Sequence, residues 1–336
     1  TLSILGGRST VPMIIESVNY YDPEDFKALQ SEAFNFHPLV VVANYCLKNS
    51  VREFYVGDLA NFTKRDPVQM RQAVDFLAQM GLVLFDAKND FVRVKQKAIL
   101  FYRTQQNKTD YDNLKIHSVV DTIENATLNF AKRRMTVHGV VAFNVSDSLN
   151  CIIVPDSATI VLLQNRDLKF DGRISAGNFE IIGKDFTLKY DSFFISMNQI
   201  DSIGFFVTEK NSQGQEVRRR IDNVMQGADS AHAATAGITQ IRSSSGTLYI
   251  SKPNNKSGRV STHEYPRLDA TNGGVIYFDR REILNGVYDR SIFFMVPPFK
   301  LDSLNDADPA TINFNGTFAS NGMFPNFMET LHTMPD

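Results

Sequence analysis

The hydrophobic pattern of the chain changes from helical spacing in residues 37–103 to short alternating segments after residue 126. In the first stretch, apolar residues recur at helical spacing, which predicts three helices over residues 38–47, 56–63 and 67–80. Two apolar segments with a polar, turn-rich loop between them then predict a β-hairpin with strands over 82–85 and 91–95.

Capping residues support the third helix of this stretch. Asp66 and Pro67 are typical of an N-cap and a first helical position, and Gly81 is typical of the residue just past a helix end. Three helices followed by a hairpin resemble a winged helix-turn-helix, and this resemblance covers residues 37–103. It rests on the order and length of the elements and implies a compact module.

The second stretch predicts a mainly β domain. Short alternating segments run from Ala126 to Val207 with Gly, Asp and Asn between them, and the pattern resumes at Gly246. Residues 104–118 are polar and predict a linker. We therefore expect an α+β multi-domain chain, with a winged-helix-like module over 1–117 and a β-rich domain over 118–336. An irregular excursion, part helix and part loop, is expected at about 209–246.

Two segments of the β domain resemble each other and favour a repeating architecture. The range 168–177 and the range 312–322 both place Phe before Asp-Gly or Asn-Gly, followed by small residues and Gly. Asp/Asn-Gly is typical of a turn with positive φ, so each segment predicts a strand, a turn and a strand. A unit of this kind at short intervals favours a β-solenoid. An antiparallel β-sandwich with two similar hairpins is the alternative.

Composition places few limits on partners. The 336 residues are 43% hydrophobic, which is ample for a core, and the net charge of −2 gives no overall attraction to nucleic acid or to an anionic membrane. Cys46 and Cys151 lie in apolar patterns, which predicts buried thiols. Two cysteines cannot build a disulfide framework or a four-cysteine zinc site. No apolar run is long enough to span a bilayer.

The winged-helix-like module offers one candidate binding surface. Residues 39–103 carry ten basic and six acidic side chains, a modest excess of positive charge. On the predicted third helix, Gln and Arg side chains could read base edges, while basic residues in the preceding turn and the hairpin loop could contact phosphates. The candidate nucleic-acid contacts are Lys64, Arg65, Gln69, Arg71, Gln72 and Lys88. A packing or protein-interaction role for the module is the competing interpretation.

No other pattern predicts chemistry. The six histidines show no metal-ligand spacing, and no Gly-x-Ser-x-Gly elbow is present. The acidic run of Asp302, Asp306 and Asp308 lacks the Gly and terminal Glu of a calcium loop, so we interpret it as a solvated loop, with weak calcium binding as the alternative. We predict no catalytic residue, no cofactor and no metal site.

Three segments of the β domain carry a further resemblance: residues 165–177, 246–258 and 314–318. They resemble large, uncharacterised, β-rich proteins of the Bacteroidota, in which a winged-helix-like segment precedes long β stretches. This resemblance implies a multi-domain protein of the cell envelope or periplasm and brings no catalytic residues. The Asp171–Ile174 run also resembles rungs of bactofilin-like β-solenoids, which polymerise.

The sequence therefore predicts a non-enzymatic structural or protein-interaction segment of a larger, cell-envelope protein. Its expected partners are other domains of the same longer chain or other proteins. It begins with Thr1 rather than Met, which we take as a sign that it is part of a longer chain. The alternatives are a DNA-binding winged-helix regulator and a carbohydrate- or ligand-binding β domain, whose binding groove would have to be assembled from distant strands.

Overall fold

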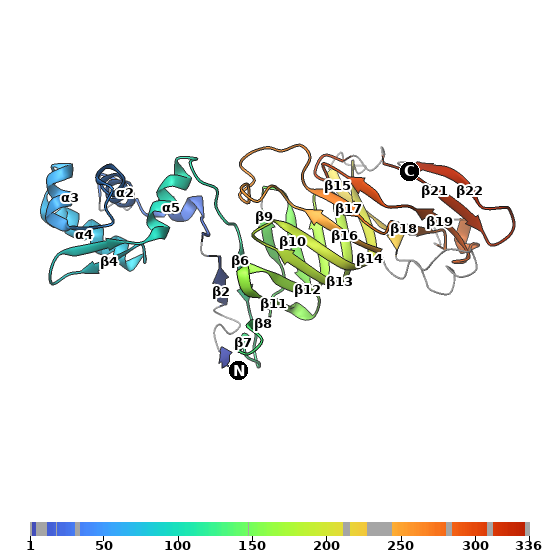
Figure 1. Cartoon of the computed structure of the whole chain (residues 1–336), viewed down its shortest axis with the longest axis horizontal. Coiled ribbons are helices and arrows are strands. Elements are labelled where there is room, and N and C mark those ends of the chain that lie inside the picture. Colours follow the sequence, from blue (N-terminus) through green and yellow to red (C-terminus); the bar gives the residue numbers. More distant parts are fainter. Residues whose placement is uncertain are drawn as a thin grey trace. The chain divides into compact units, whose positions relative to one another are not determined.

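The computed structural model describes residues 2–4, 12–17, 19–30, 34–146, 148–210, 216–226, 244–279, 284–307 and 312–332, with backbone alone for 207–210 and 216–226. The fold is mixed α+β and consists mostly of sheet, as the sequence predicts at that level. The chain forms two compact units with separate hydrophobic cores (Figure 1). Unit 2 comprises Ser17–Asn113, and unit 1 comprises Thr1–Glu16 with Leu114–Asp336.

Unit 2 contains the helices of the described chain. Their starts follow from capping, because Asp22, His37 and Asp66 each accept a hydrogen bond from a backbone N–H of the first turn and are followed by Pro. The five helices are α1 (Pro23–Ala28), α2 (Pro38–Asn49), α3 (Val56–Thr63), α4 (Pro67–Gln79) and α5 (Gln96–Gln105).

The three predicted helices of residues 37–103 correspond to α2, α3 and α4. The predicted hairpin corresponds to β4 (Val83–Asp86) and β5 (Phe91–Val94), and Gly81 has the expected positive φ of 71°. Two elements escaped prediction. One is β3 (Glu53–Tyr55), which pairs with β5 to complete a three-stranded sheet in the order β3-β5-β4, and the other is α5.

The apolar faces of these elements form one core. Leu39, Leu59, Met70 and Leu77 are fully buried in it, and Phe101 from α5 is also buried. Helix α5 was missed because its buried residues run continuously from Ala98 to Tyr102, without the alternation of an amphipathic helix.

The chain passes between the two units twice. Within unit 1, β2 (Met13–Glu16) pairs antiparallel with β6 (Lys115–Ser118), and Glu16 lies opposite Lys115. Residues 115–118, predicted as the end of a linker, are thus strand. Unit 2 is therefore an insertion between two paired strands of unit 1, whereas the sequence predicted a module of residues 1–117 followed by the β domain.

Among its described residues, unit 1 is built around one large sheet of seventeen strands, and every pairing with a defined register in it is antiparallel. Short 3-10 turns occur at Asp156–Ala158, Gln164–Arg166 and Leu284–Gly286. The strands are β1 (Leu2–Ile4), β7 (Ala126–Asn129), β8 (Arg134–His138), β9 (Phe143–Ser146), β10 (Cys151–Pro155), β11 (Thr159–Leu162), β12 (Leu168–Ala176), β13 (Phe179–Lys189), β14 (Phe194–Lys210), β15 (Glu216–Gln226), β16 (Ser244–Tyr249), β17 (Arg267–Ala270), β18 (Gly274–Tyr277), β19 (Ile292–Val296), β20 (Phe299–Leu301), β21 (Asn313–Ser320) and β22 (Phe327–His332).

The sheet bends at its three long central strands, β12, β13 and β14. Each pairing between them contains a register shift, between Phe170 and Gly172 in β12 and between Ile182 and Gly183 in β13. Such bulges bend a strand and increase its twist. Glycine is required at the bend because a Cβ at Gly172 would lie 2.4 Å from the Val154 carbonyl oxygen, and one at Gly183 would lie 2.1 Å from that of Gln199.

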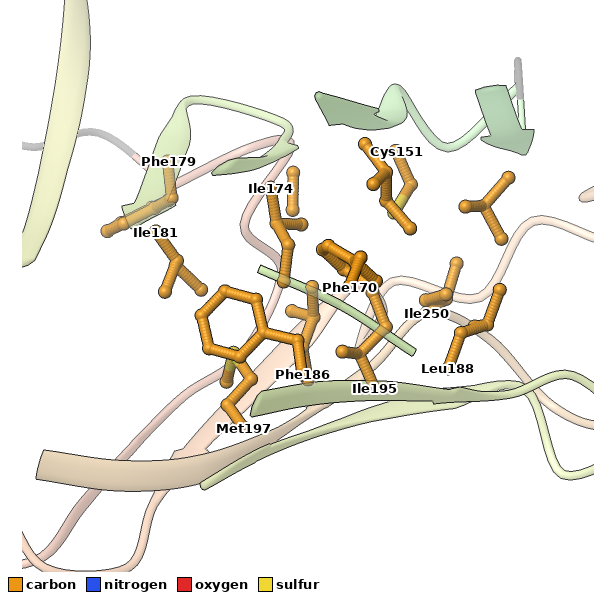
Figure 2. Packing of buried hydrophobic residues seen from close by; sticks show 14 of the residues in the cluster. Cys151, Phe170, Ile174, Phe179, Ile181, Phe186, Leu188, Ile195, Met197 and Ile250 are labelled. Carbon is orange, nitrogen blue, oxygen red and sulfur yellow. The ribbon is translucent and has the colours of Figure 1, made fainter. Parts of the chain in front are cut away.

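The sheet forks on both sides of these bends. The first half of β12 pairs with β11 and its second half with β10, while the first half of β14 pairs with β16 and its second half with β15. One cluster of apolar side chains contains residues of β10, β11 and β16 as well as Phe170, Phe186 and Ile174 of the central strands. Figure 2 shows these three side chains lying together in the interior with Cys151 and Met197.

The β-solenoid prediction is wrong, because consecutive strands pair antiparallel side by side instead of stacking as rungs. The connection between β12 and β13 also excludes a solenoid rung. Only Gly177 and Asn178 join these two strands, and a link of two residues fits only a hairpin.

The two similar segments lie within strands, so the predicted turns at Asp171-Gly172 and Asn315-Gly316 are also wrong. What the segments share is the close approach of a neighbouring backbone. A Cβ at Gly316 would lie 2.0 Å from the Met295 carbonyl oxygen, much as a Cβ at Gly172 would meet Val154.

The predicted irregular excursion at 209–246 contains strand, because β15 lies inside it and β16 begins within it. The remaining parts of that range, 211–215 and 227–243, lie outside the described residues.

Candidate nucleic-acid interface

The candidate interface lies on the α3–turn–α4 segment and the β4–β5 loop of unit 2. Helix α3 ends at Thr63, and Lys64 adopts a left-handed conformation with φ of 54°, donating its N–H to the carbonyls of Ala60 and Asn61. The side chain of Asp66 then accepts the N–H of Gln69 at 3.1 Å and starts α4. This tight turn exposes Lys64, while Arg65 is partly buried.

Arg65 is held within unit 2. Its guanidinium lies over the ring of Phe36 at 4.4 Å from the centroid, and its Nη1 donates to the Asn35 side-chain oxygen at 3.0 Å. A guanidinium stacked on an aromatic ring is stabilised by the ring's negative face. A phosphate contact by Arg65 would therefore compete with contacts inside the unit.

Arg71 is also held in place, and it joins α4 to the β4–β5 loop. Its Nη1 donates to the Asp90 carboxylate, its Nη2 donates to the Ala87 carbonyl at 2.6 Å, and the guanidinium lies 5.7 Å from the centre of the Phe85 ring. Because Asp90 carries the opposite charge, the pair reduces the positive charge that α4 presents to solvent.

Lys88 lies in a loop that is shaped by an acidic side chain. The Asp86 carboxylate accepts hydrogen bonds from the Asn89 side chain at 2.8 Å and from the N–H of Lys88 at 3.0 Å. These bonds lower the pKa of Asp86, the Asn89 bond having the largest effect, so Asp86 stays negative next to Lys88. The loop therefore presents a lysine beside a fixed carboxylate.

The six predicted residues thus fall into two groups. Arg65 and Arg71 are engaged inside unit 2, whereas Lys64, Gln72 and Lys88 are exposed, and Gln69 is partly exposed. Within the described part of unit 2, the side chains of these four residues have no hydrogen bond or ion pair. Arg71 contacts the loop that carries Lys88, and no described contact joins Lys64 or Gln72 to that loop.

The sequence analysis missed the ion pairs of two acidic residues in unit 2. The sequence places Asp90 and Glu53 in the acidic count without partners, but the fold pairs Asp90 with Arg71, and Glu53 with Arg93 at 2.6 Å across β3 and β5. The Glu53 pairing depends on β3, which was not predicted. The Arg71 pairing joins residues 19 positions apart, and local pattern carries no signal for it.

The two cysteines and the acidic run of residues 302–308 were the other segments considered for a chemical role. Burial raises the pKa of Cys46 to about 11 and that of Cys151 to about 12, so both stay protonated at neutral pH. Asp302 lies 3.8 Å from Arg267, and Asp308 lies outside the described residues. Across the described residues, no three His, Cys, Asp or Glu side chains converge on a metal position. No helix among them is long and apolar enough to cross a bilayer.

Comparison with known proteins assigns the chain to no family. No protein-family model matches the chain, and neither the curated proteins nor the solved structures include one that matches it.

Proposed function

We propose that this chain is a non-enzymatic structural or protein-interaction segment of a larger protein, located in the cell envelope. The observation that supports the proposal most directly is that the Arg71 side chain is bound within unit 2. This residue is the arginine that the sequence places on the exposed face of α4, and its guanidinium is committed to Asp90 and Ala87 of the same unit.

A base-reading helix needs side chains that are free to reach base edges. For Arg71 to do so, it would give up an ion pair and a hydrogen bond, and Asp90 would be left facing the DNA backbone as an uncompensated negative charge. Arg65 would likewise leave Phe36 and Asn35. Internal contacts of this kind support a packing role for the α3–turn–α4 segment.

We also propose that residues 37–103 form a winged helix. The order α2, β3, α3, α4, β4, β5 supports this proposal, with β3 as the third strand of the small sheet. The outer face of that sheet exposes Tyr55 and Leu84, which are 56% and 51% accessible. A sheet face of this composition suits contact with another protein better than contact with phosphates.

A DNA-binding regulator is the second candidate. It is favoured by Lys64, Gln72 and Lys88, whose side chains are exposed and have no partner within the described part of unit 2. Lysines of this kind could contact phosphates without any rearrangement, and Gln72 could hydrogen-bond to adenine.

Titration of the whole chain against fluorescent random-sequence duplex DNA at low and moderate salt distinguishes the two candidates. We expect no change in anisotropy that depends on salt. Binding that falls steeply with salt and that Lys64→Ala and Lys88→Ala both weaken would overturn the structural proposal. The matched control is Lys27→Ala, which removes an exposed lysine of α1 outside the candidate interface.

A further inference from the structure

The strand β2 is attached to unit 1 through few contacts. It pairs antiparallel with β6 (Figure 1), and no other strand among the described residues has a register with it. Met13 and Ile15 pack against the core of unit 1 but are only partly buried, and Ile14 on the opposite face is 49% accessible. A two-stranded ladder is marginally stable by itself, so the pairing of β2 depends on what else holds the two strands together.

The partner strand β6 is fixed to unit 1 by contacts of its own. Ile116 and Ser118 are fully buried. The Ser118 hydroxyl donates to the His138 carbonyl at 2.6 Å and accepts the side-chain N–H of Asn125 at 2.9 Å. β2 is therefore the strand that can leave the ladder while β6 stays in place.

The two ends of unit 2 are joined to each other inside that unit. The N–H of Asp112 donates to the Asn19 carbonyl at 3.0 Å, and the N–H of Tyr21 donates to the Asp112 carbonyl at 3.2 Å. Tyr21 is buried, and its ring centroid lies 5.1 Å from that of Phe101 in α5 and 5.0 Å from that of Tyr111. Because these contacts belong to the core of unit 2, the ends are held together only while that core is folded.

We infer that folded unit 2 holds β2 on β6, so that the folding of unit 2 and the pairing of β2 stabilise each other. The chain leaves β2 at Glu16 and returns at Lys115, and these residues lie opposite each other in the ladder. With unit 2 unfolded, the loop between them has about a hundred residues, whereas the Asn19–Asp112 hydrogen bond shortens the path to about six residues. The probability of closing a loop falls as about the 3/2 power of its length, so this roughly sixteenfold difference corresponds to about 60-fold in the pairing of β2.

This coupling makes β2 a reporter of the state of unit 2. A partner that binds folded unit 2 and stabilises it strengthens the attachment of β2, whereas an event that opens unit 2 releases Met13 and Ile15 from the core of unit 1. The coupling goes beyond the proposed function and does not depend on it, because it responds to any event that folds or opens unit 2.

Aspartate substitutions on the two faces of β2 test the coupling in one direction, with amide hydrogen exchange of the whole chain as the measurement. Ile15→Asp places a charge against the core of unit 1 and should release β2. Exchange in α4 of unit 2 should then become up to about 60-fold faster, because the ends of unit 2 are no longer joined when it unfolds. Ile14→Asp places the same charge in solvent and is the matched control, for which exchange in α4 should stay within about twofold of the native chain.

Aspartate substitutions in α4 test the reverse direction. Leu77 is fully buried, so Leu77→Asp should unfold unit 2. The amides of β2 should then exchange faster by the same factor of about 60, because coupling between two equilibria is reciprocal. The amides of β13 should not change. Val68→Asp is the matched control at a position of the same helix that is 62% accessible, and it should leave exchange in α4 and β2 within about twofold of the native chain.

Two results would overturn the inference. One is an Ile15→Asp chain that loses protection in β2 with no change in α4, and the other is a Leu77→Asp chain that loses protection in α4 with no change in β2. If Ile15→Asp also removes protection from β13, unit 1 has unfolded as a whole, and the comparison of Leu77→Asp with Val68→Asp then decides. Faster exchange across β13 in the Leu77→Asp chain would also contradict the inference, because the coupling would then involve all of unit 1 and not β2 alone.

Discussion

Unit 2 and unit 1 differ in the range of the contacts that define their elements. In unit 2, helices begin at local caps such as Asp66, which bonds to a residue three positions away. In unit 1, the bend of β12 depends on Gly172, which lies opposite Pro155 of β10 and where a Cβ would lie 2.4 Å from the Val154 carbonyl oxygen. A substitution in unit 2 should therefore act mainly on one helix or loop, whereas a substitution at the bends of unit 1 should affect several strands together.

The largest effect is expected for Phe170→Ala in unit 1. Phe170 is 4% accessible and packs edge-on against Phe186, with 5.5 Å between the ring centres. The cavity left by the substitution should lower the free energy of unfolding of unit 1 by about 3–5 kcal/mol. Hydrogen exchange measured by mass spectrometry would show faster exchange in unit 1 peptides and little change in unit 2.

The matched control for this substitution is Phe130→Ala, which removes a ring that is 63% accessible and should change the free energy of unfolding only slightly. A loss near zero for Phe170→Ala would contradict its place in the core. Equal losses in both units would show that the two cores do not unfold separately.

A smaller effect is expected from a methyl group at the bend of β12. Gly172 has φ of 139°, and a Cβ there would lie 2.4 Å from the Val154 carbonyl oxygen. Gly172→Ala should therefore destabilise unit 1 by about 1–3 kcal/mol through backbone strain alone. Exchange should rise in β10, β12 and β13 together.

Gly57→Ala in α3 makes the comparison between the units sharper. Gly57 lies in a helix, and a Cβ there would meet nothing within 4 Å. The same chemical change should stabilise unit 2 by roughly 0.5–1 kcal/mol, because alanine loses less backbone entropy in a helix. Opposite signs for the two substitutions are the expected result, and destabilisation by both would contradict the open environment of Gly57.

These two glycines also show what local pattern could and could not predict. The helices α2, α3 and α4 and the β4–β5 hairpin were predicted because their caps and apolar spacing are encoded within a few residues. The Asp171-Gly172 pair has the local sequence of a turn but lies within β12. Glycine is required there because the backbone of β10, about twenty residues earlier in the sequence, lies too close for a side chain. A single sequence carries no signal for this close contact between strands.

The candidate interface divides in the same way. Exposure of Lys64 and Lys88 follows from their places in a turn and a loop, and the sequence predicted both. The engagement of Arg71 by Asp90 depends on how α4 packs beside the hairpin, so the predicted DNA contact could not be distinguished from a structural one.

The Arg71–Asp90 pair should contribute a modest amount to unit 2. Both side chains are nearly half exposed, at 45% and 47%, so a double-mutant cycle with Arg71→Met and Asp90→Asn should give a coupling energy of roughly 0.5–1 kcal/mol. Asn is a suitable replacement because residue 90 has a positive φ of 52°. Chemical denaturation at low salt and at high salt measures the coupling, which screening should reduce. A coupling that does not change with salt would contradict an exposed ion pair.

The smallest effect concerns the pH dependence of unit 2, where His37 is the one histidine within Ser17–Asn113. Its Nδ1 accepts the N–H of Val40 at 3.4 Å, and its Nε2 lies 3.0 Å from the Phe26 carbonyl oxygen, to which it donates in the neutral form. Burial lowers the pKa of His37, so the folded chain binds its proton less readily than the unfolded chain.

The free energy of unfolding of unit 2 should therefore fall as pH drops below the ordinary histidine value of about 6.5, and the loss should level off below the folded pKa. The effect is measured from the denaturation midpoint of unit 2 at a series of pH values from about 7.5 to about 5.5, a range that includes the histidine transition. His37→Asn keeps a side chain that can cap α2 but does not titrate, so subtracting its pH dependence isolates the contribution of His37. If the native chain and the His37→Asn variant lose the same free energy of unfolding on acidification, the loss comes from carboxylates. Protonation of His37 then makes no contribution to the pH dependence of unit 2.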